Sequence, residues 1–292
     1  MQRKFIAILL SVVFAVTAEA SAQPLLSDCR FEFSLDTIEG MRPREKGETP
    51  QGMAIHNGTM FTLYHGGSCV VTDIDTQKLL GEFTIDSAQG THCNNASFGP
   101  ANTDSPSQFP LLYVSECFAP CRCFVEEVTT GGSHTVATII YTGSGIDSFC
   151  DWCTDRENRH IYAYGRTPER GVVLKRFALP TPDDADENGI IELGDSDILE
   201  EFVYPAGVFV IAQGSYISDG RIYLPTGVPA KSDCFIHVLS LNDGRHIDRI
   251  DISDLGLEPE GLCIHDGRLW QFFGGGNGTL YSFGLSHREE KL

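Results

Sequence analysis

The sequence predicts an all-β fold, a β-propeller with about five blades of four antiparallel strands each. Residues 51–61, 213–223 and 260–270 each contain a short apolar strand, an Asn-Gly or Asp-Gly dipeptide and a second strand. Such dipeptides favour tight hairpins because both turn residues need positive φ. Looser copies begin at His92 and Cys150. Starts that recur every roughly 40–60 residues are typical of propeller blades, with a six-bladed ring and a β-sandwich as alternatives.

The outer strands of the blades follow each hairpin. Third strands are expected at 69–74, 123–126 and 234–239, and fourth strands at 80–85 and 246–250. The last copy has only a third strand, at 280–283, before the chain ends. We therefore expect residues 29–35, near the N-terminus, to supply its fourth strand and to close the ring, which removes exposed sheet edges.

The first 22 residues have the pattern of a secretory signal peptide. Arg3 and Lys4 precede an apolar run from 5 to 18, and Ala20 and Ala22 supply the small residues that a signal peptidase requires. One alternative is an uncleaved membrane anchor, for which the apolar run is short. A second alternative is a lipoprotein with its lipid attached at Cys29. The sequence thus predicts a secreted or periplasmic protein whose residues 23–292 form one propeller domain.

The composition narrows the range of partners. The formal net charge is -19, and such an acidic surface repels phosphate backbones, so we expect no nucleic-acid partner. No later segment is apolar enough to span a membrane, and we expect a monomer that binds a small molecule, a sugar or a peptide.

The ten cysteines of the chain all follow residue 22. In an exported protein an even number favours disulfides, with a metal site among the cysteines from 117 to 153 as the alternative. Cys93 and Cys150 hold equivalent positions at the starts of neighbouring blades. We therefore predict a disulfide between them.

Polar residues recur where the innermost strands begin. Since these starts surround the channel, we expect them to form a ligand-binding face with the loops between second and third strands. The blade starts contribute Gln51, His92, Asn94, Asp151, Gln213 and Glu260, and the loops contribute His65, Glu116, Arg166, Lys231 and residues 274–277. The alternative is that each side chain only bonds the backbone of neighbouring blades.

The segment 258–262, Glu-Pro-Glu-Gly-Leu, followed by Asp-Gly-Arg-Leu at 266–269, resembles a blade start of secreted bacterial propellers of the gluconolactonase-like and YVTN-like kind. The resemblance implies a propeller. In gluconolactonase-like enzymes a Glu, Asn side chains and an Asp hold a divalent metal above the channel. Glu260, Asn94 or Asn95, and Asp151 would take those places here, which implies a metal-dependent hydrolase or lactonase as the alternative to a non-catalytic binding protein.

A second resemblance concerns residues 49–53. Thr-Pro-Gln-Gly-Met is similar to the first blade of propeller-type glutaminyl cyclotransferases, whose further Gly-Glu-Gly and Glu-Gly-Trp-Gly elements do not occur in this sequence. Glutaminyl cyclisation is therefore the third functional hypothesis, after ligand binding and metal-dependent hydrolysis.

An acidic stretch at 184–195 has the spacing of a calcium-binding loop. Oxygen ligands fall at the first, third and fifth positions, with glycine at the sixth. The predicted ligands are Asp184, Asp186, Asn188, Glu192 and Asp195. The alternative is a solvated acidic loop before a short helix at 197–201.

Overall fold

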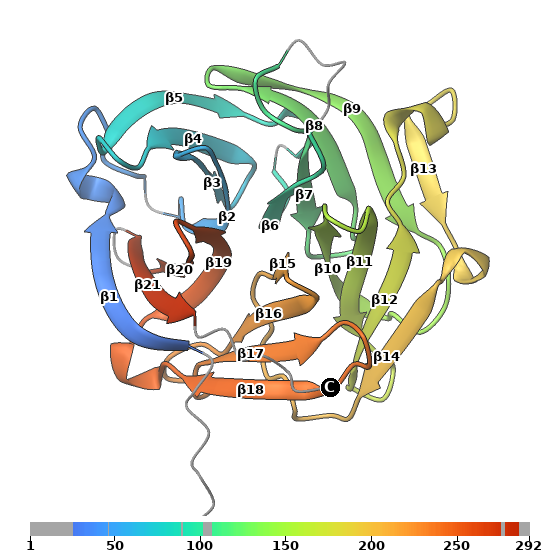
Figure 1. The fold of residues 1–292 in the computed structure, drawn as a ribbon. Coiled ribbons are helices and arrows are strands. Elements are labelled where there is room, and N and C mark those ends of the chain that lie inside the picture. Colours follow the sequence, from blue (N-terminus) through green and yellow to red (C-terminus); the bar gives the residue numbers. More distant parts are fainter. Residues whose placement is uncertain (1–25, 46, 89, 102–106, 276–277, 286–292) are drawn as a thin grey trace, which may run out of the picture.

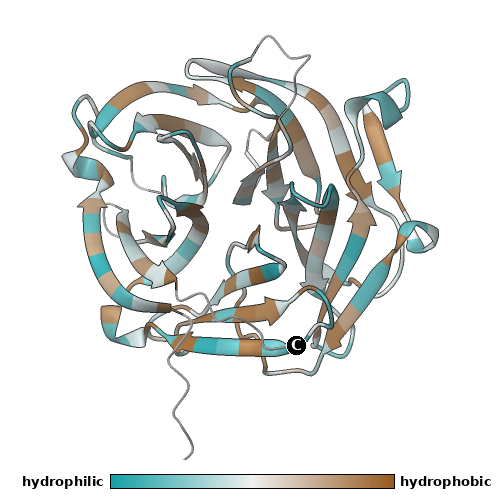
Figure 2. Ribbon diagram, viewed as in Figure 1, coloured by the Kyte–Doolittle hydropathy of each residue, from teal (hydrophilic) through white to brown (hydrophobic). Residues whose placement is uncertain are grey.

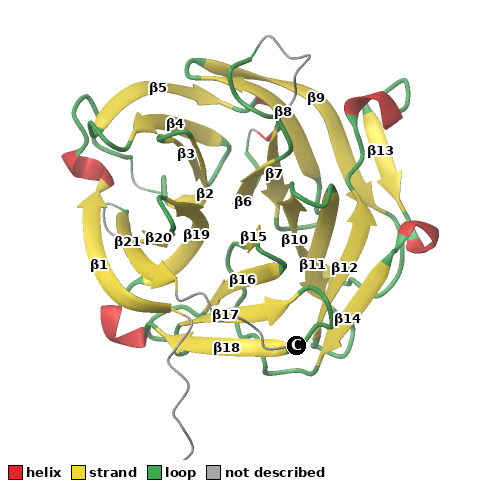
Figure 3. Cartoon of the chain, viewed as in Figure 1, coloured by secondary structure: helices red, strands yellow, loops and turns green. Residues whose placement is uncertain are grey.

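A computed structural model shows five β-sheets arranged as a ring around a central axis (Figure 1; Figure 3). It describes residues 26–45, 47–88, 90–101, 107–275 and 278–285. Each sheet contains four antiparallel strands, which lie side by side in order from the axis to the rim. One sheet has an additional strand. The predicted five-bladed propeller is confirmed, and residues 1–22, the predicted signal peptide, lie outside the described residues.

The blades follow the chain order from the innermost strand outward. Blade 1 contains β2 (Pro50–His56), β3 (Thr59–Tyr64), β4 (Ser68–Asp73) and β5 (Lys78–Thr84), and blade 2 contains β6 (Cys93–Phe98), β7 (Leu112–Glu116), β8 (Cys123–Thr129) and β9 (Gly132–Tyr141). Blade 3 contains β10 (Ser148–Asp155), β11 (His160–Arg166), β12 (Val172–Ala178) and β14 (Glu200–Tyr204), and blade 4 contains β15 (Tyr216–Ser218), β16 (Arg221–Thr226), β17 (Phe235–Ser240) and β18 (His246–Asp251). Blade 5 contains β19 (Glu258–His265), β20 (Arg268–Gly274) and β21 (Thr279–Leu285).

The N-terminal strand β1 (Leu26–Ser34) completes blade 5. It pairs antiparallel with β21, with Leu26 opposite Leu285 and Ser34 opposite Thr279. The ring is therefore closed by strands from both ends of the described chain, as the sequence predicts (Figure 1).

Glycines allow the innermost strands to approach one another. A Cβ on Gly261 would lie 2.4 Å from the backbone nitrogen of Met53, and one on Gly52 would lie 2.9 Å from the carbonyl carbon of Asn95. A side chain there would therefore collide with the neighbouring blade. In the hairpin turns, Asn57 and Gly58 both have positive φ, 47° and 75°, as their sequence predicts.

The hydrophobic core lies between the blades rather than within one of them. Five clusters of buried apolar side chains each join two neighbouring blades, the last joining blade 5 to blade 1. Apolar and polar residues alternate along the outermost strands (Figure 2), as in strands with one face covered and the other in water.

The connection between the third and fourth strands of blade 3, β12 and β14, differs from the prediction. Strand β13 (Ile190–Leu193) pairs in parallel with β9 and extends blade 2. The helix expected at 197–201 is not formed, because Glu200 and Glu201 belong to β14, where they form ion pairs with Arg176 and Lys175 of β12. The described helices are one-turn 3₁₀ segments at Leu35–Thr37, Asp86–Ala88, Pro182–Asp184, Asp195–Asp197 and Ser253–Leu255. Within the described part of the chain, none of the helices has the length and apolar character needed to cross a bilayer.

Candidate functional site

An open cavity of about 530 Å³ lies at one end of the axis, where the innermost strands begin. A cavity of this size suits a small molecule. Most of the predicted blade-start residues line it, and so do residues that the sequence did not single out. The lining includes the predicted Gln51, His92, Asn94, Arg166, Gln213, Lys231 and Glu260, and the further Phe118, Phe149, Ile211 and Glu258.

β-Bulges aim these side chains at the cavity. The register of the innermost pair of strands shifts at the start of β2, β6, β10 and β19. The residues within these shifts include Gln51, Asn94, Phe149 and Glu260. A bulge turns side chains out of the regular alternation, and this explains why polar groups on packed innermost strands face the cavity.

Glu260 lies on the floor of the cavity and is almost completely buried. Its Oε1 accepts a hydrogen bond from Nε2 of Gln51 at 3.3 Å, while its Oε2 has no hydrogen-bond partner among the described residues. Burial, followed by the negative charges of Glu258 and Asp151, raises the pKa of Glu260 well above 4.5. Burial therefore favours the protonated side chain, which can donate a hydrogen bond as well as accept one.

Asp151 lies behind Asn94 and is fully buried. Its Oδ2 accepts a hydrogen bond of 2.8 Å from Nδ2 of Asn94, and its Oδ1 has no partner in the described part of the chain. Burial raises the pKa of Asp151 to about 8, against the opposing effect of the Asn94 hydrogen bond. The charge of Asp151 acts on Glu260, and the pKa values of both carboxyl groups are raised, so burial favours their protonated forms.

Two histidines extend this network to the surface. Nε2 of His92 donates to Oε1 of Gln51 at 2.9 Å, so neutral His92 accepts at Nδ1 from Nδ1 of His65, also at 2.9 Å. Burial and the neighbouring His65 lower the pKa of His92. This chain of hydrogen bonds holds the Gln51 amide in the orientation that donates to Glu260.

Other predicted residues have structural partners instead. Glu116 is buried and forms a two-pronged ion pair with Arg122, at 2.7 and 2.8 Å. Asn95, the alternative to Asn94, donates to the Trp152 carbonyl at 3.0 Å and to Ser215 at 2.9 Å, which links blades 2, 3 and 4 beneath the cavity. Of the two asparagines, Asn94 therefore faces the ligand space.

The predicted calcium loop is spread over a turn, β13 and a 3₁₀ segment. The Asp184 carboxylate accepts two hydrogen bonds from Thr181, Asp186 accepts from the backbone of Asn188 and Ile190, and Asp195 accepts from Tyr141 and Ser144. Glu192 is exposed on β13. Among the described residues, no group of three or more His, Cys, Asp or Glu side chains is arranged to hold a metal ion. Calcium binding stays a prediction.

All ten cysteines are free thiols in this structure. Cys93 packs in the core between blades 1 and 2, whereas Cys150 packs in the core between blades 2 and 3. Equivalent positions on successive innermost strands therefore direct their side chains into different inter-blade layers. The Cys93–Cys150 disulfide is not formed here and stays a prediction.

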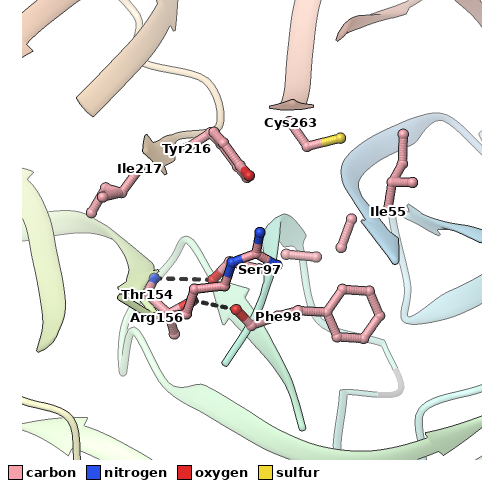
Figure 4. Close-up of a pocket in the computed structure, with 10 residues that line it drawn as sticks. Ile55, Ser97, Phe98, Thr154, Arg156, Tyr216, Ile217 and Cys263 are labelled. Carbon is pink, nitrogen blue, oxygen red and sulfur yellow. Dashed lines mark hydrogen bonds between the residues drawn. The ribbon is translucent and has the colours of Figure 1, made fainter. Parts of the chain in front are cut away.

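The axis also has a small pocket of about 20 Å³ at its other end, lined by residues of all five innermost strands. Figure 4 shows the guanidinium of Arg156 there, between Tyr216, Ser97 and Cys263. This pocket has room for about one water molecule, so the large cavity is the better candidate for a ligand site.

No protein-family profile and no curated protein sequence match the chain. Among solved structures, the glutaminyl cyclase of Myxococcus xanthus superposes with a TM-score of 0.52 at 12% identity, covering 89% of this chain and 97% of that one. A chain of a nidogen/laminin complex gives a TM-score of 0.40 at 10% identity over 70% of this chain and 64% of that one, which is too distant to carry an argument. The first likeness supports the propeller fold alone, and neither supports the gluconolactonase-like or YVTN-like resemblance in particular.

Proposed function

We propose that this chain is an exported propeller that binds a small polar molecule in the cavity at the channel mouth. The observation that carries the proposal is the floor of the cavity. Oε2 of Glu260, which lines the cavity, and Oδ1 of Asp151, which lies behind Asn94 and does not line it, are buried oxygen atoms without a hydrogen-bond partner among the described residues. Such atoms are costly to leave unpaired, and a ligand that bonds them removes that penalty.

The protonation of these carboxyl groups defines the ligand further. Glu260 and the amides of Gln51, Asn94 and Gln213 line the cavity. Burial raises the pKa values of Glu260 and of Asp151, which lies behind Asn94, and so favours protonated carboxyl groups that add donors to the acceptors. A hydroxyl, amide or carbonyl group fits this floor at neutral pH. An amine or another cation would have to displace a proton, so its affinity should increase with pH.

The test is a ligand screen by thermal shift on the mature chain and on Glu260→Gln. Wild-type protein should be stabilised by at least one small polar compound, and Glu260→Gln should bind that compound about tenfold more weakly. The matched control is Glu157→Gln, in the turn between β10 and β11, which should bind normally. An unchanged affinity in Glu260→Gln would place the site elsewhere.

A second function, metal-dependent hydrolysis, is favoured by the same unpaired oxygens. Glu260 and Asp151, with the side-chain carbonyl oxygen of Asn94, are oxygen donors of the kind that calcium and magnesium prefer. Chelator-treated protein should then gain thermal stability with one divalent cation and hydrolyse a lactone only in its presence. Glu260→Gln should lose both properties. Cyclisation of an N-terminal glutamine is the third activity to assay, because a glutaminyl cyclase is among the solved structures that superpose on this chain.

A further inference from the structure

A side pocket of about 240 Å³ opens beside the main cavity. The two spaces share four lining residues, Phe149, Arg166, Ile211 and Ala212. Arg166 ends β11 and is half-buried, so its guanidinium stands at the junction between the two spaces. A ligand group bound at Arg166 can therefore extend from the polar cavity into the side pocket.

The charges of the side pocket have one sign. Its lining contains two arginines, Arg166 and Arg170, and no aspartate or glutamate. Within the described part of the chain, neither arginine forms an ion pair. This is unusual in a protein whose formal net charge is -19, and it favours an anionic group at this place.

A buried hydroxyl group lies in the same pocket. Tyr164 lines the pocket and is 2% exposed, and its Oη has no hydrogen-bond partner among the described residues. The charges of Asp151 and, less strongly, Arg166 act on this hydroxyl in opposite directions, so both groups lie near it. Burial raises the pKa of Asp151 to about 8 and so favours its neutral form. A buried O–H without an acceptor beside an unpaired guanidinium is a donor pair that a carboxylate satisfies.

The remaining wall is apolar. Phe149, Val172, Phe209, Val210 and Ile211 surround the two donors, and Val210 is 45% exposed. This wall suits a hydrocarbon or an aromatic ring rather than an ion with a full hydration shell.

The backbone adds an independent signal. Phe149 and Ile211, which flank Arg166, have φ values of 57° and 54°. Bulky and β-branched residues rarely adopt this left-handed conformation, and such strained residues cluster at ligand-binding sites. Here the strain holds two apolar side chains against the junction between the spaces.

We propose that the side pocket is a subsite for a carboxylate that carries an apolar or aromatic tail. The carboxylate accepts hydrogen bonds from the guanidinium of Arg166 and from Oη of Tyr164, and the tail packs on Phe149, Phe209 and Ile211. Glu260 lines the main cavity and not the side pocket, so a variant at Glu260 distinguishes occupation of the subsite from the function proposed above.

The test compares three probes by isothermal titration calorimetry with the mature chain. Hydrocinnamate has a carboxylate on an aromatic tail, hydrocinnamamide is its neutral counterpart, and acetate has no tail. Hydrocinnamate should bind about tenfold or more tightly than either of the others, and its affinity should fall as salt is added.

Variants assign the binding to the subsite. Arg166→Gln and Tyr164→Phe should each weaken hydrocinnamate binding about tenfold. Arg156→Gln removes the same charge at the other end of the axis and should have no effect. Glu260→Gln should change the affinity by no more than about twofold, because Glu260 does not line the side pocket. If Arg166→Gln does not fold, Arg166→Lys, which retains the charge, replaces it as the test variant.

Several results would overturn the subsite. Equal affinity for hydrocinnamate and its amide, or undetectable hydrocinnamate binding at millimolar concentration, would show that no carboxylate site exists there. Binding that survives Arg166→Gln and Tyr164→Phe but is lost in Glu260→Gln would assign the probe to the main cavity, which would refute the subsite and leave the proposed function standing.

Discussion

Replacing Asp151 by asparagine should make the protein more stable in mildly alkaline solution. Burial raises the pKa of Asp151 from 3.8 to about 8, so the folded protein retains a proton that the unfolded chain releases. The folded state is then favoured at pH below 3.8. As the pH rises from 3.8 to about 8, the free energy of unfolding falls by about 1.4 kcal/mol for each pH unit. Across that window the upper limit of the loss is about 5–6 kcal/mol.

An asparagine side chain has the shape of the protonated carboxyl group, can still accept the hydrogen bond from Asn94, and does not ionise. We therefore expect Asp151→Asn to be more stable than wild type by a few kcal/mol at pH 8, and close to it at pH 4. Urea unfolding at several pH values measures the difference. Asp254→Asn, an exposed carboxyl group on the last 3₁₀ segment, corrects for the general effect of lost negative charge. Parallel pH profiles for wild type and Asp151→Asn would refute the reasoning.

Two further perturbations probe the ring and the acidic loop. Gly261→Ala should destabilise the fold by about 1–3 kcal/mol, because the new Cβ would lie 2.4 Å from the Met53 nitrogen; urea unfolding tests this, with Gly131→Ala, which has open space around it, as the control. If residues 184–195 bind calcium, chelation should lower the melting temperature, and Asp184→Ala should abolish that effect. If calcium does not change the melting temperature of the wild-type protein, residues 184–195 are a solvated acidic loop and not a calcium site.

The sequence was sufficient for the ring because its signals are local. Asn57-Gly58, Asp219-Gly220 and Asp266-Gly267 form hairpin turns in which both residues have positive φ. The unfinished last blade also indicated that an N-terminal strand was needed, and β1 fills this place. Strand β13 gave no such signal, since its partner β9 lies about fifty residues away and the pairing is parallel. The supposed helix at 197–201 was wrong because residues 200–204 pair with β12 as strand β14, and Glu200 and Glu201 form ion pairs across that pairing.

The sequence located the main cavity but not the state of its groups. The repeats show where each innermost strand starts. They therefore predict that Gln51, Asn94 and Glu260 lie at the same end of the axis. Whether a carboxyl group is ionised depends on burial and on neighbours from other blades, so the protonated Asp151 could not be foreseen. The left-handed conformations of Phe149 and Ile211 carry no sequence signal either, because neither residue type favours positive φ.

The packing of the ring explains why unpaired polar atoms gather at the axis. Gly52 and Gly261 allow adjacent innermost strands to come into backbone contact near the axis. The side chains at these strand starts are therefore crowded together. Bulges at four of the five strand starts then release Gln51, Asn94, Phe149 and Glu260 from the regular alternation and direct them to the channel mouth. A bulge interrupts the backbone hydrogen bonds of the ladder, and repeating it in four blades would weaken the ring without a compensating gain. The proposed ligand would supply that gain by bonding the unpaired Oε2 of Glu260, since the same bulges that weaken the strand starts form the cavity in which it would bind.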